Sequence, residues 1–250
     1  MRSNAIPTIM IQVLPEEERK HALHIIHVVR LLNLEIEKIE ADLKLFEYGK
    51  EKANEAFTAG GPPGSTGGVD RMQRAFEDQA LYSHWVHIAV RDAALNIFHF
   101  EDILTTLEFK ECPKFRSMVD ANLLRKARSD FSGAFPDTRR IRDNIGHSGE
   151  FAARAKRSEE NSVSSGLEQF GMQTGPESSI KVGMGISGNT AYTTYKSTHE
   201  AEASVRTFDL SASTIRKLEE IFLQVCAAFQ PASDQTRALN RAASGLPPDP

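Results

Sequence analysis

Cysteine is nearly absent from this chain of 250 residues, which contains only Cys112 and Cys226. Two cysteines cannot form the disulfide framework that stabilises small secreted proteins, so we expect a reducing compartment and place the protein in the cytoplasm. Neither cysteine has a histidine close to it in the sequence, and Ser148 lacks the strand-to-helix turn that exposes a nucleophilic serine. The sequence therefore does not favour an enzyme with a covalent nucleophile.

Long hydrophobic runs are absent as well. No apolar segment reaches the roughly 18–20 residues that a membrane-spanning helix needs. The apolar stretch 6–14 is short, and Pro15 and three glutamates follow it directly, which is a poor match to a signal peptide. We therefore expect a short strand or an anchoring arm at the N-terminus, and no membrane partner.

The net charge of −4 excludes a protein that coats nucleic acid over its whole surface. The charge is uneven, because residues 114–157 contain 11 Lys or Arg and 5 Asp or Glu, a net +6, which leaves −10 for the remainder. A local basic surface on an acidic body suits an anionic ligand such as a nucleotide or a short RNA. The alternative is that these cations only solvate helix faces.

The first hundred residues predict a helical hairpin. Apolar residues recur at spacings of three to five over residues 15–58, as expected for a helix with one buried face. Pro15 and the acidic first turn favour helix initiation. The Gly- and Pro-rich stretch 59–68 breaks the pattern, and a second long helix is predicted for residues 69–109. Two long helices joined by a loop are typical of a helical bundle.

Three shorter helices are predicted in the rest of the chain. Pro113 and Pro136 precede segments with helical periodicity, and Ser211 is a favourable helix cap. The predicted helices comprise residues 114–131, 137–156 and 212–229.

A small antiparallel β insertion, residues 179–208, is predicted before the last helix. Apolar residues alternate with polar ones there, and Ser187, Gly188 and Asn189 form a turn signal. We expect an exposed loop at 157–178 and a disordered tail at 231–250. The predicted fold class is mainly α, with a single helical-bundle domain over residues 1–230.

One segment of the predicted helix 137–156 has distinctive chemistry, Arg142-Asp143-Asn144-Ile145-Gly146-His147. Asp143 and His147 lie one helical turn apart on the same face, so the carboxylate can orient the imidazole and hold a proton on it. The guanidinium of Arg142 flanks that face and can clamp a phosphate. Metal-free RNA cleavage uses such a pair. The histidine moves a proton to or from the ribose hydroxyl or the leaving oxygen, and the arginine stabilises the phosphate as charge builds up.

At these positions the sequence resembles the HEPN family (higher eukaryotes and prokaryotes nucleotide-binding domains). Its small helical bundles carry Arg, a polar residue, three variable positions and His on a late helix. Arg142, Asp143 and His147 match that pattern, and the small residues Ser148 and Gly149 follow. The resemblance implies a homodimeric, metal-independent endoribonuclease without a cofactor, in which two copies of the motif face one cleft. It implies Arg142 and His147 as the catalytic pair, with Asp143 in support. The β insertion departs from a minimal bundle of this family.

A second hypothesis comes from a different class of protein, a non-catalytic helical module for dimerisation or another interaction. In that case Arg142 pairs with Asp143 or Glu150 on the surface, His147 forms a hydrogen bond within the bundle, and Gly146 permits close helix packing. The directions of the Arg142 and His147 side chains discriminate between the two hypotheses.

Polar residues of the second predicted helix are secondary candidates. His84, His87 and Arg91 share one helix face because their spacings are three and four. We expect them, together with Asn144, to line the same cleft as the Arg-His pair. Phe98 is interpreted as a core residue rather than a platform on which a base stacks.

Histidines of the first predicted helix suggest a metal site less strongly. His21, His24 and His27 recur at intervals of three, and Glu18 precedes them. A di-iron bundle needs Glu-x-x-His on two helices, and the second copy is absent from the sequence. The glycine-rich stretch 59–68 also does not match the Gly-x-x-x-x-Gly-Lys-[Ser/Thr] pattern of a phosphate-binding loop. We therefore expect no metal and no cofactor.

Overall fold

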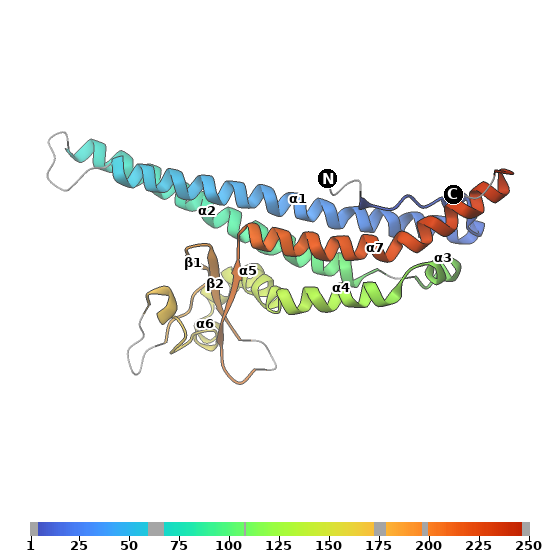
Figure 1. Ribbon diagram of the computed structural model, residues 1–250. Coiled ribbons are helices and arrows are strands. Elements are labelled where there is room, and N and C mark those ends of the chain that lie inside the picture. The colour runs from blue at the N-terminus through green and yellow to red at the C-terminus, as the bar shows by residue number, and fades with distance from the viewer. Residues whose placement is uncertain (1–4, 60–67, 108, 173–178, 197–199, 247–250) are drawn as a thin grey trace. The chain divides into compact units, whose positions relative to one another are not determined.

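The computed structural model describes residues 5–59, 68–107, 109–172, 179–196 and 200–246; within these ranges, the side chains of residues 147–153 and 155 are outside the description. The described chain is mainly helical, with a three-stranded antiparallel sheet before the last helix (Figure 1). The predicted fold class is thereby confirmed. None of the helices in the described ranges combines the length and the apolar character needed to cross a membrane.

Two long helices, α1 (Glu16–Ala59) and α2 (Gly68–Thr105), form the predicted hairpin and lie side by side in Figure 1. The helices approach closely at Gly49. A Cβ atom there would lie 2.9 Å from Val86 Cγ2 and 3.2 Å from the carbonyl oxygen of Tyr82. Glycine is therefore the residue that allows this close crossing of two helix backbones.

Residue contacts divide the chain into two compact units, whereas we expected a single domain. Unit 1 comprises residues 1–37, 99–136 and 213–250, and unit 2 comprises residues 38–98 and 137–212. Because the boundaries cut through the long helices, α1 and α2 each contribute residues to both units. The two units are described separately below.

Unit 1 contains α3 (Pro113–Met118), α4 (Ala121–Ala134) and α7 (Ala212–Ala243). Its core is aromatic, and the rings of Phe100 and Phe131 stack with their centroids 5.7 Å apart. A single helix was predicted over residues 114–131, and that prediction is wrong because the helix is interrupted between Met118 and Ala121. The Asp120 side chain accepts hydrogen bonds from the amides of Asn122 and Leu123 and so starts a new helix.

The helix α3 begins at a carboxylate supplied by α1. Glu18 is buried, and its Oε1 and Oε2 each accept a hydrogen bond of 2.9 Å, from the amides of Lys114 and Phe115. These amides are donors of the first helical turn, which have no partner within the helix. Pro113 has no amide hydrogen to satisfy. Glu18 therefore stabilises the start of α3 rather than joining a metal site.

The predicted disordered tail is wrong for residues 231–243, which continue α7. The Ser233 hydroxyl donates to the carbonyl oxygen of Thr8 at 2.8 Å, and the Met10 amide donates to Thr236 Oγ1 at 3.1 Å. Both polar side chains are buried. The N-terminal segment thus acts as an anchoring arm, and its contacts order a stretch that appears unstructured from its composition.

Unit 2 contains α5 (Thr138–Ala153), α6 (Ala155–Glu160) and the strands β1 (Gly185–Ser187), β2 (Thr190–Tyr195) and β3 (Ser204–Asp209). The strand order is β1-β2-β3, and both pairs are antiparallel. Lys50 of α1 donates to Gly188 O at 2.9 Å and to Asn189 Oδ1 at 3.0 Å. These bonds attach the β1–β2 turn to the helical hairpin.

A small hydrophobic cluster packs beside this sheet. Val163, Leu167 and Tyr192 are buried in it, and the Phe170 and Tyr192 rings stack with centroids 4.0 Å apart. The predicted exposed loop at 157–178 is therefore wrong for residues 157–160, which belong to α6, and for the buried Asn161, Val163 and Leu167. Residues 164–166 and 168–169 are exposed, as expected. Residues 173–178 are outside the described ranges.

Asp42 gives unit 2 a dependence on pH. Asn96 of α2 donates to Asp42 Oδ2 at 2.8 Å. Burial raises the pKa of Asp42 to about 6 from its ordinary 3.8, which outweighs the opposing effect of the Asn96 hydrogen bond. Because the folded pKa is raised, the stability that Asp42 contributes is fully present below about pH 4 and is lost as the pH rises through about 6.

We therefore expect Asp42→Asn to raise the free energy of unfolding at pH 7.5 by about 1–2 kcal/mol, allowing for solvent screening of this partly buried group. The gain should vanish at pH 4, where the aspartic acid is already neutral. Urea unfolding at the two pH values measures the difference. Asp102→Asn, at an exposed position of α2, is the control and should show no such dependence. An equal effect of Asp42→Asn at both pH values would contradict the assignment.

Candidate functional site

The first turn of α5 is fixed to the sheet by four charged side chains. Arg206 of β3 pairs with Asp137 at 3.2 Å and also with Glu200. Arg140 of α5 lies 3.3 Å from the same Asp137 oxygen and 3.4 Å from Glu200 Oε1. Arg206 is only 15% exposed, so solvent screens its ion pairs less than it screens surface pairs. The helix that carries the candidate motif is therefore held firmly at its start.

Asn144 is the second anchor of α5. It is fully buried, and its Nδ2 donates to the carbonyl oxygen of Gly183 at 2.8 Å and to Thr193 Oγ1 of β2. We expected this residue to line a cleft, and that expectation is wrong. Its amide joins α5 to β2 and to the segment that precedes β1, and this burial sets which side of α5 faces solvent.

Arg142 lies on the solvent-facing part of α5 and is supported by α2. Its guanidinium carbon lies 4.3 Å from the centroid of the Phe98 ring, a cation–π contact. Its Nη1 also donates to Asp143 Oδ1 at 2.8 Å. The side chains of Arg142 and Asp143 are 40% and 37% exposed. A guanidinium that lies over an aromatic ring is restrained by it, while its N–H donors can still bind an anion.

Phe98 therefore has a role that its sequence pattern did not indicate. It is half-buried, as a residue at the edge of a core would be, yet one face of its ring carries the arginine. Helical periodicity marks a residue as apolar and inward-facing, but it does not say which side chain of another helix covers it. Only the packing of α5 beside α2 brings these two residues together.

His147 belongs to α5, as predicted, but its side chain lies outside the described residues. The helical backbone places its position one turn after Asp143. Gly146, immediately before it, is exposed, and no described atom lies within 4 Å of where its Cβ would be. Among the described residues, none therefore packs closely against Gly146. The ion pair between Arg142 and Asp143, which we expected for a non-catalytic module, is present.

The secondary candidates of α2 are exposed. His84, His87 and Arg91 all have solvent-accessible side chains, and Arg91 Nε lies 3.4 Å from Asp92 Oδ1. Arg91 precedes Phe98 by seven residues, two helical turns, so the two residues share one helix face. The separation along the helix axis is about 10 Å. Arg91 therefore lies on the same face of α2 as Phe98, the residue that Arg142 of α5 contacts, about two helical turns away from it.

Tyr195, at the end of β2, is a neighbour of this site that sequence reasoning missed. Burial raises the pKa of its hydroxyl, and the carboxylates of Asp143 and Glu200 raise it further, while Arg157 and Arg140 lower it. The phenol therefore stays protonated at neutral pH and can donate a hydrogen bond. No spacing rule connects a strand residue to a helix 50 positions earlier, so the sequence carries no signal for it.

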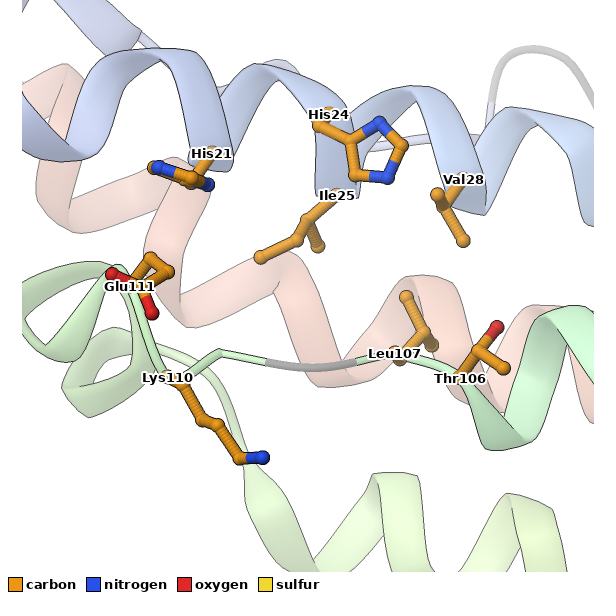
Figure 2. A pocket seen from close by; sticks show the side chains of 8 residues that line it. All are labelled: His21, His24, Ile25, Val28, Thr106, Leu107, Lys110 and Glu111. Atoms are coloured by element: carbon orange, nitrogen blue, oxygen red, sulfur yellow. The ribbon is translucent and has the colours of Figure 1, made fainter.

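The histidines of α1 are in unit 1, beside a pocket of about 320 Å³ (Figure 2). His21 and His24 line it, whereas His27 does not. Figure 2 shows Glu111 near His21 and the Lys110 side chain extending away from both histidines. In the described part of the chain, no group of three or more His, Cys, Asp or Glu side chains is arranged to hold a metal ion.

The two cysteines are poor candidates for a catalytic nucleophile. Both cysteines are buried, and neither forms a disulfide bond. Burial raises the pKa of Cys226 to about 12 and also raises that of Cys112. A thiol with a raised pKa is a poor nucleophile at neutral pH, which agrees with the expectation from sequence.

The chain matches no family model, and comparisons with curated proteins and with solved structures found no match.

Proposed function

We propose that this protein binds RNA along the exposed side of α5 and cleaves it with Arg142 and His147, as a HEPN-like endoribonuclease that uses no metal. The observation that carries the proposal is the placement of Arg142. Its guanidinium carbon lies over the Phe98 ring, and its side chain is 40% exposed. A merely structural surface ion pair with Asp143 does not require an aromatic support. An anion-binding arginine benefits from it, because less side-chain entropy is lost on binding.

In the proposed reaction, Arg142 binds the phosphate whose charge increases as the ribose 2′-oxygen bonds to phosphorus. The bond between phosphorus and the 5′-oxygen breaks at the same centre. One proton leaves the 2′-hydroxyl and one reaches the 5′-oxygen, and His147 moves protons between these atoms and solvent. Asp143 holds Arg142 through its ion pair, and its position is one helical turn before that of His147.

The exposed residues of α2 extend this site in the proposal. His84, His87 and Arg91 precede Phe98 on the same helix face, so a strand whose phosphate binds Arg142 would meet a further arginine and two imidazoles along α2. Contacts of this kind depend strongly on salt, because each neutralised phosphate releases counterions. A second copy of the chain would bring a second motif to the cleft, as in the dimers of the family that the sequence resembles.

The test is cleavage of end-labelled single-stranded RNA by the full chain in the presence of EDTA. We expect cleavage by the unmodified protein, and at least about a 100-fold lower rate for both Arg142→Ala and His147→Ala. Arg216→Ala is the control for loss of one cation, since Arg216 is exposed on α7, and it should retain the full rate. Circular dichroism shows that each variant is folded.

Two results would contradict the nuclease proposal. Cleavage that stops in EDTA would contradict a metal-independent mechanism. RNA that stays intact under every condition, without measurable binding, would contradict the assignment of this site to RNA.

A dimerisation module is the second candidate, favoured by an exposed apolar surface on the hairpin. Val69, Met72 and Phe76 of α2 are 76%, 38% and 56% exposed, and their spacing of three and four matches a coiled-coil seam. In sedimentation velocity, Phe76→Glu should shift a dimer toward monomer. Leu81→Glu, an equally apolar and exposed position off that seam, should not. Intact RNA together with that shift favours this function over the first.

A further inference from the structure

A second pocket of unit 1 combines an apolar floor with a cationic rim. It has a volume of about 420 Å³ and lies between the segment after α2, α3 and the first half of α4. Its floor includes Leu107, Val119 and Leu124, which are buried. A volume in this range, with apolar walls and a few charged groups, is typical of sites for small organic ligands.

Four cationic residues line this pocket, Lys110, Arg116, Arg125 and Arg128. No carboxylate is among the described lining residues. Lys110 lines the histidine pocket as well as this one, and its side chain extends away from the two histidines in Figure 2. The neighbouring Glu111 lines the histidine pocket and is not among the residues that line this one. The Asp120 carboxylate is engaged at the start of α4, where it accepts from two amides. The lining that the structure describes is therefore positively charged.

The arginines differ in how firmly they are held. Arg128 donates to the carbonyl oxygens of Leu104 at 3.1 Å and Leu107 at 3.2 Å, so its guanidinium is fixed where α2 ends. Arg125 donates to the Asn122 side chain at 2.5 Å. Within the described part of the chain, the Arg116 guanidinium makes no hydrogen bond or ion pair, and the side chain is exposed. One fixed arginine and one uncommitted arginine thus face one pocket.

This pocket also accounts for three of the eleven Lys and Arg residues in the basic stretch 114–157. Residues 114–157 carry +6, and the α5 site uses only the later part of that stretch. Arg116, Arg125 and Arg128 come from its beginning, and they belong to unit 1. Like-charged side chains gathered around an apolar surface repel each other, and a bound anion relieves that repulsion.

We infer that this pocket binds a phosphate monoester whose organic part is apolar or aromatic. Guanidinium groups bind phosphate oxygens in bidentate fashion. The positive charge of the four cations is also greater than the negative charge of a ligand with a single carboxylate. Leu107, Val119 and Leu124 would accept the organic group, since burying apolar surface favours binding. The inference is independent of the proposed nuclease, because every residue it uses lies in unit 1.

Isothermal titration calorimetry on the full chain tests this inference with hexyl phosphate, phenyl phosphate, inorganic phosphate and hexanoate. We expect at least one of the two esters to bind tenfold or more tightly than inorganic phosphate and hexanoate. The preference between hexyl and phenyl esters tells whether the organic part is aliphatic or aromatic. The double variant Arg116→Ala with Arg125→Ala should weaken ester binding at least tenfold. Lys126→Ala, an exposed cation of α4 that pairs with Asp130 and does not line the pocket, should change it less than twofold.

Four outcomes would overturn the inference. Hexanoate that binds as tightly as hexyl phosphate would exclude phosphate recognition, and inorganic phosphate that binds as tightly as both esters would exclude a role for the apolar floor. An unchanged affinity in the double variant, or no heat from any of the four compounds at millimolar concentration, would exclude this pocket. Should the double variant prove unfolded, Arg116→Glu alone gives the same test, because that side chain is exposed.

Discussion

Replacement of Glu18 by alanine is expected to lower the free energy of unfolding by about 2–4 kcal/mol, because two buried charge-assisted hydrogen bonds are lost. The Glu18 carboxylate is 4% exposed and binds the amides of Lys114 and Phe115. Cys112, at the cap position of α3, makes no side-chain capping bond. The truncated side chain would thus leave both amides without an acceptor in a place that water reaches poorly.

Glu17→Ala is the matched control, since Glu17 occupies the same helical turn but is exposed. Its removal should change the free energy of unfolding by no more than about 0.5 kcal/mol. Urea unfolding followed by circular dichroism measures both variants. Hydrogen exchange adds a local measurement, because the Lys114 and Phe115 amides should lose protection only in Glu18→Ala. Equal stability of the two variants would show that the carboxylate does not support α3.

Asn144→Asp is expected to destabilise the protein by about 3 kcal/mol or more at pH 7.5, although the two side chains have the same shape. The change replaces the amide donor that faces Gly183 O and Thr193 Oγ1 with a carboxylate oxygen. A buried carboxylate opposite a carbonyl oxygen is desolvated and repelled, so its pKa in the folded state would rise. The destabilisation should therefore shrink as the pH falls toward 4, where the introduced group becomes protonated.

Asp143→Asn provides the comparison on the same helix. This adjacent side chain is 37% exposed, and an amide oxygen can still accept from Arg142. We expect a change of about 0.5 kcal/mol or less in the free energy of unfolding. Urea unfolding of both variants at pH 7.5 and pH 5 measures the effects. A well-tolerated aspartate at position 144 would indicate that the residue faces a cleft after all.

The long helices were predictable because their determinants are local. Helical periodicity, Pro15 and the glycine-rich stretch 59–68 are all read within a few turns, and α1 and α2 begin and end within a few residues of the expected positions. The same reasoning failed for α7 beyond Pro231. Composition there indicates disorder, but Ser233 and Thr236 form hydrogen bonds with an N-terminal segment more than 220 residues away.

The candidate site shows the same division at the level of side chains. Its motif was visible because Arg142, Asp143 and His147 are close in sequence. The burial of Asn144 was not visible, since it depends on Gly183 and Thr193 from a separate segment. From the sequence alone, a polar residue within a polar motif is expected to be exposed, because the strand that buries it comes from a separate segment.

The sequence by itself determined the two long helices, the antiparallel strands before the last helix, the order of these elements and which residues of the motif lie one turn apart, because each of these depends on neighbours along the chain. Only the tertiary structure decided that Phe98 supports Arg142, that Glu18 caps α3 and that four cations surround an apolar pocket. These arrangements join residues from different elements, and their free energy comes from burial and hydrogen bonding that exist only after the elements have packed.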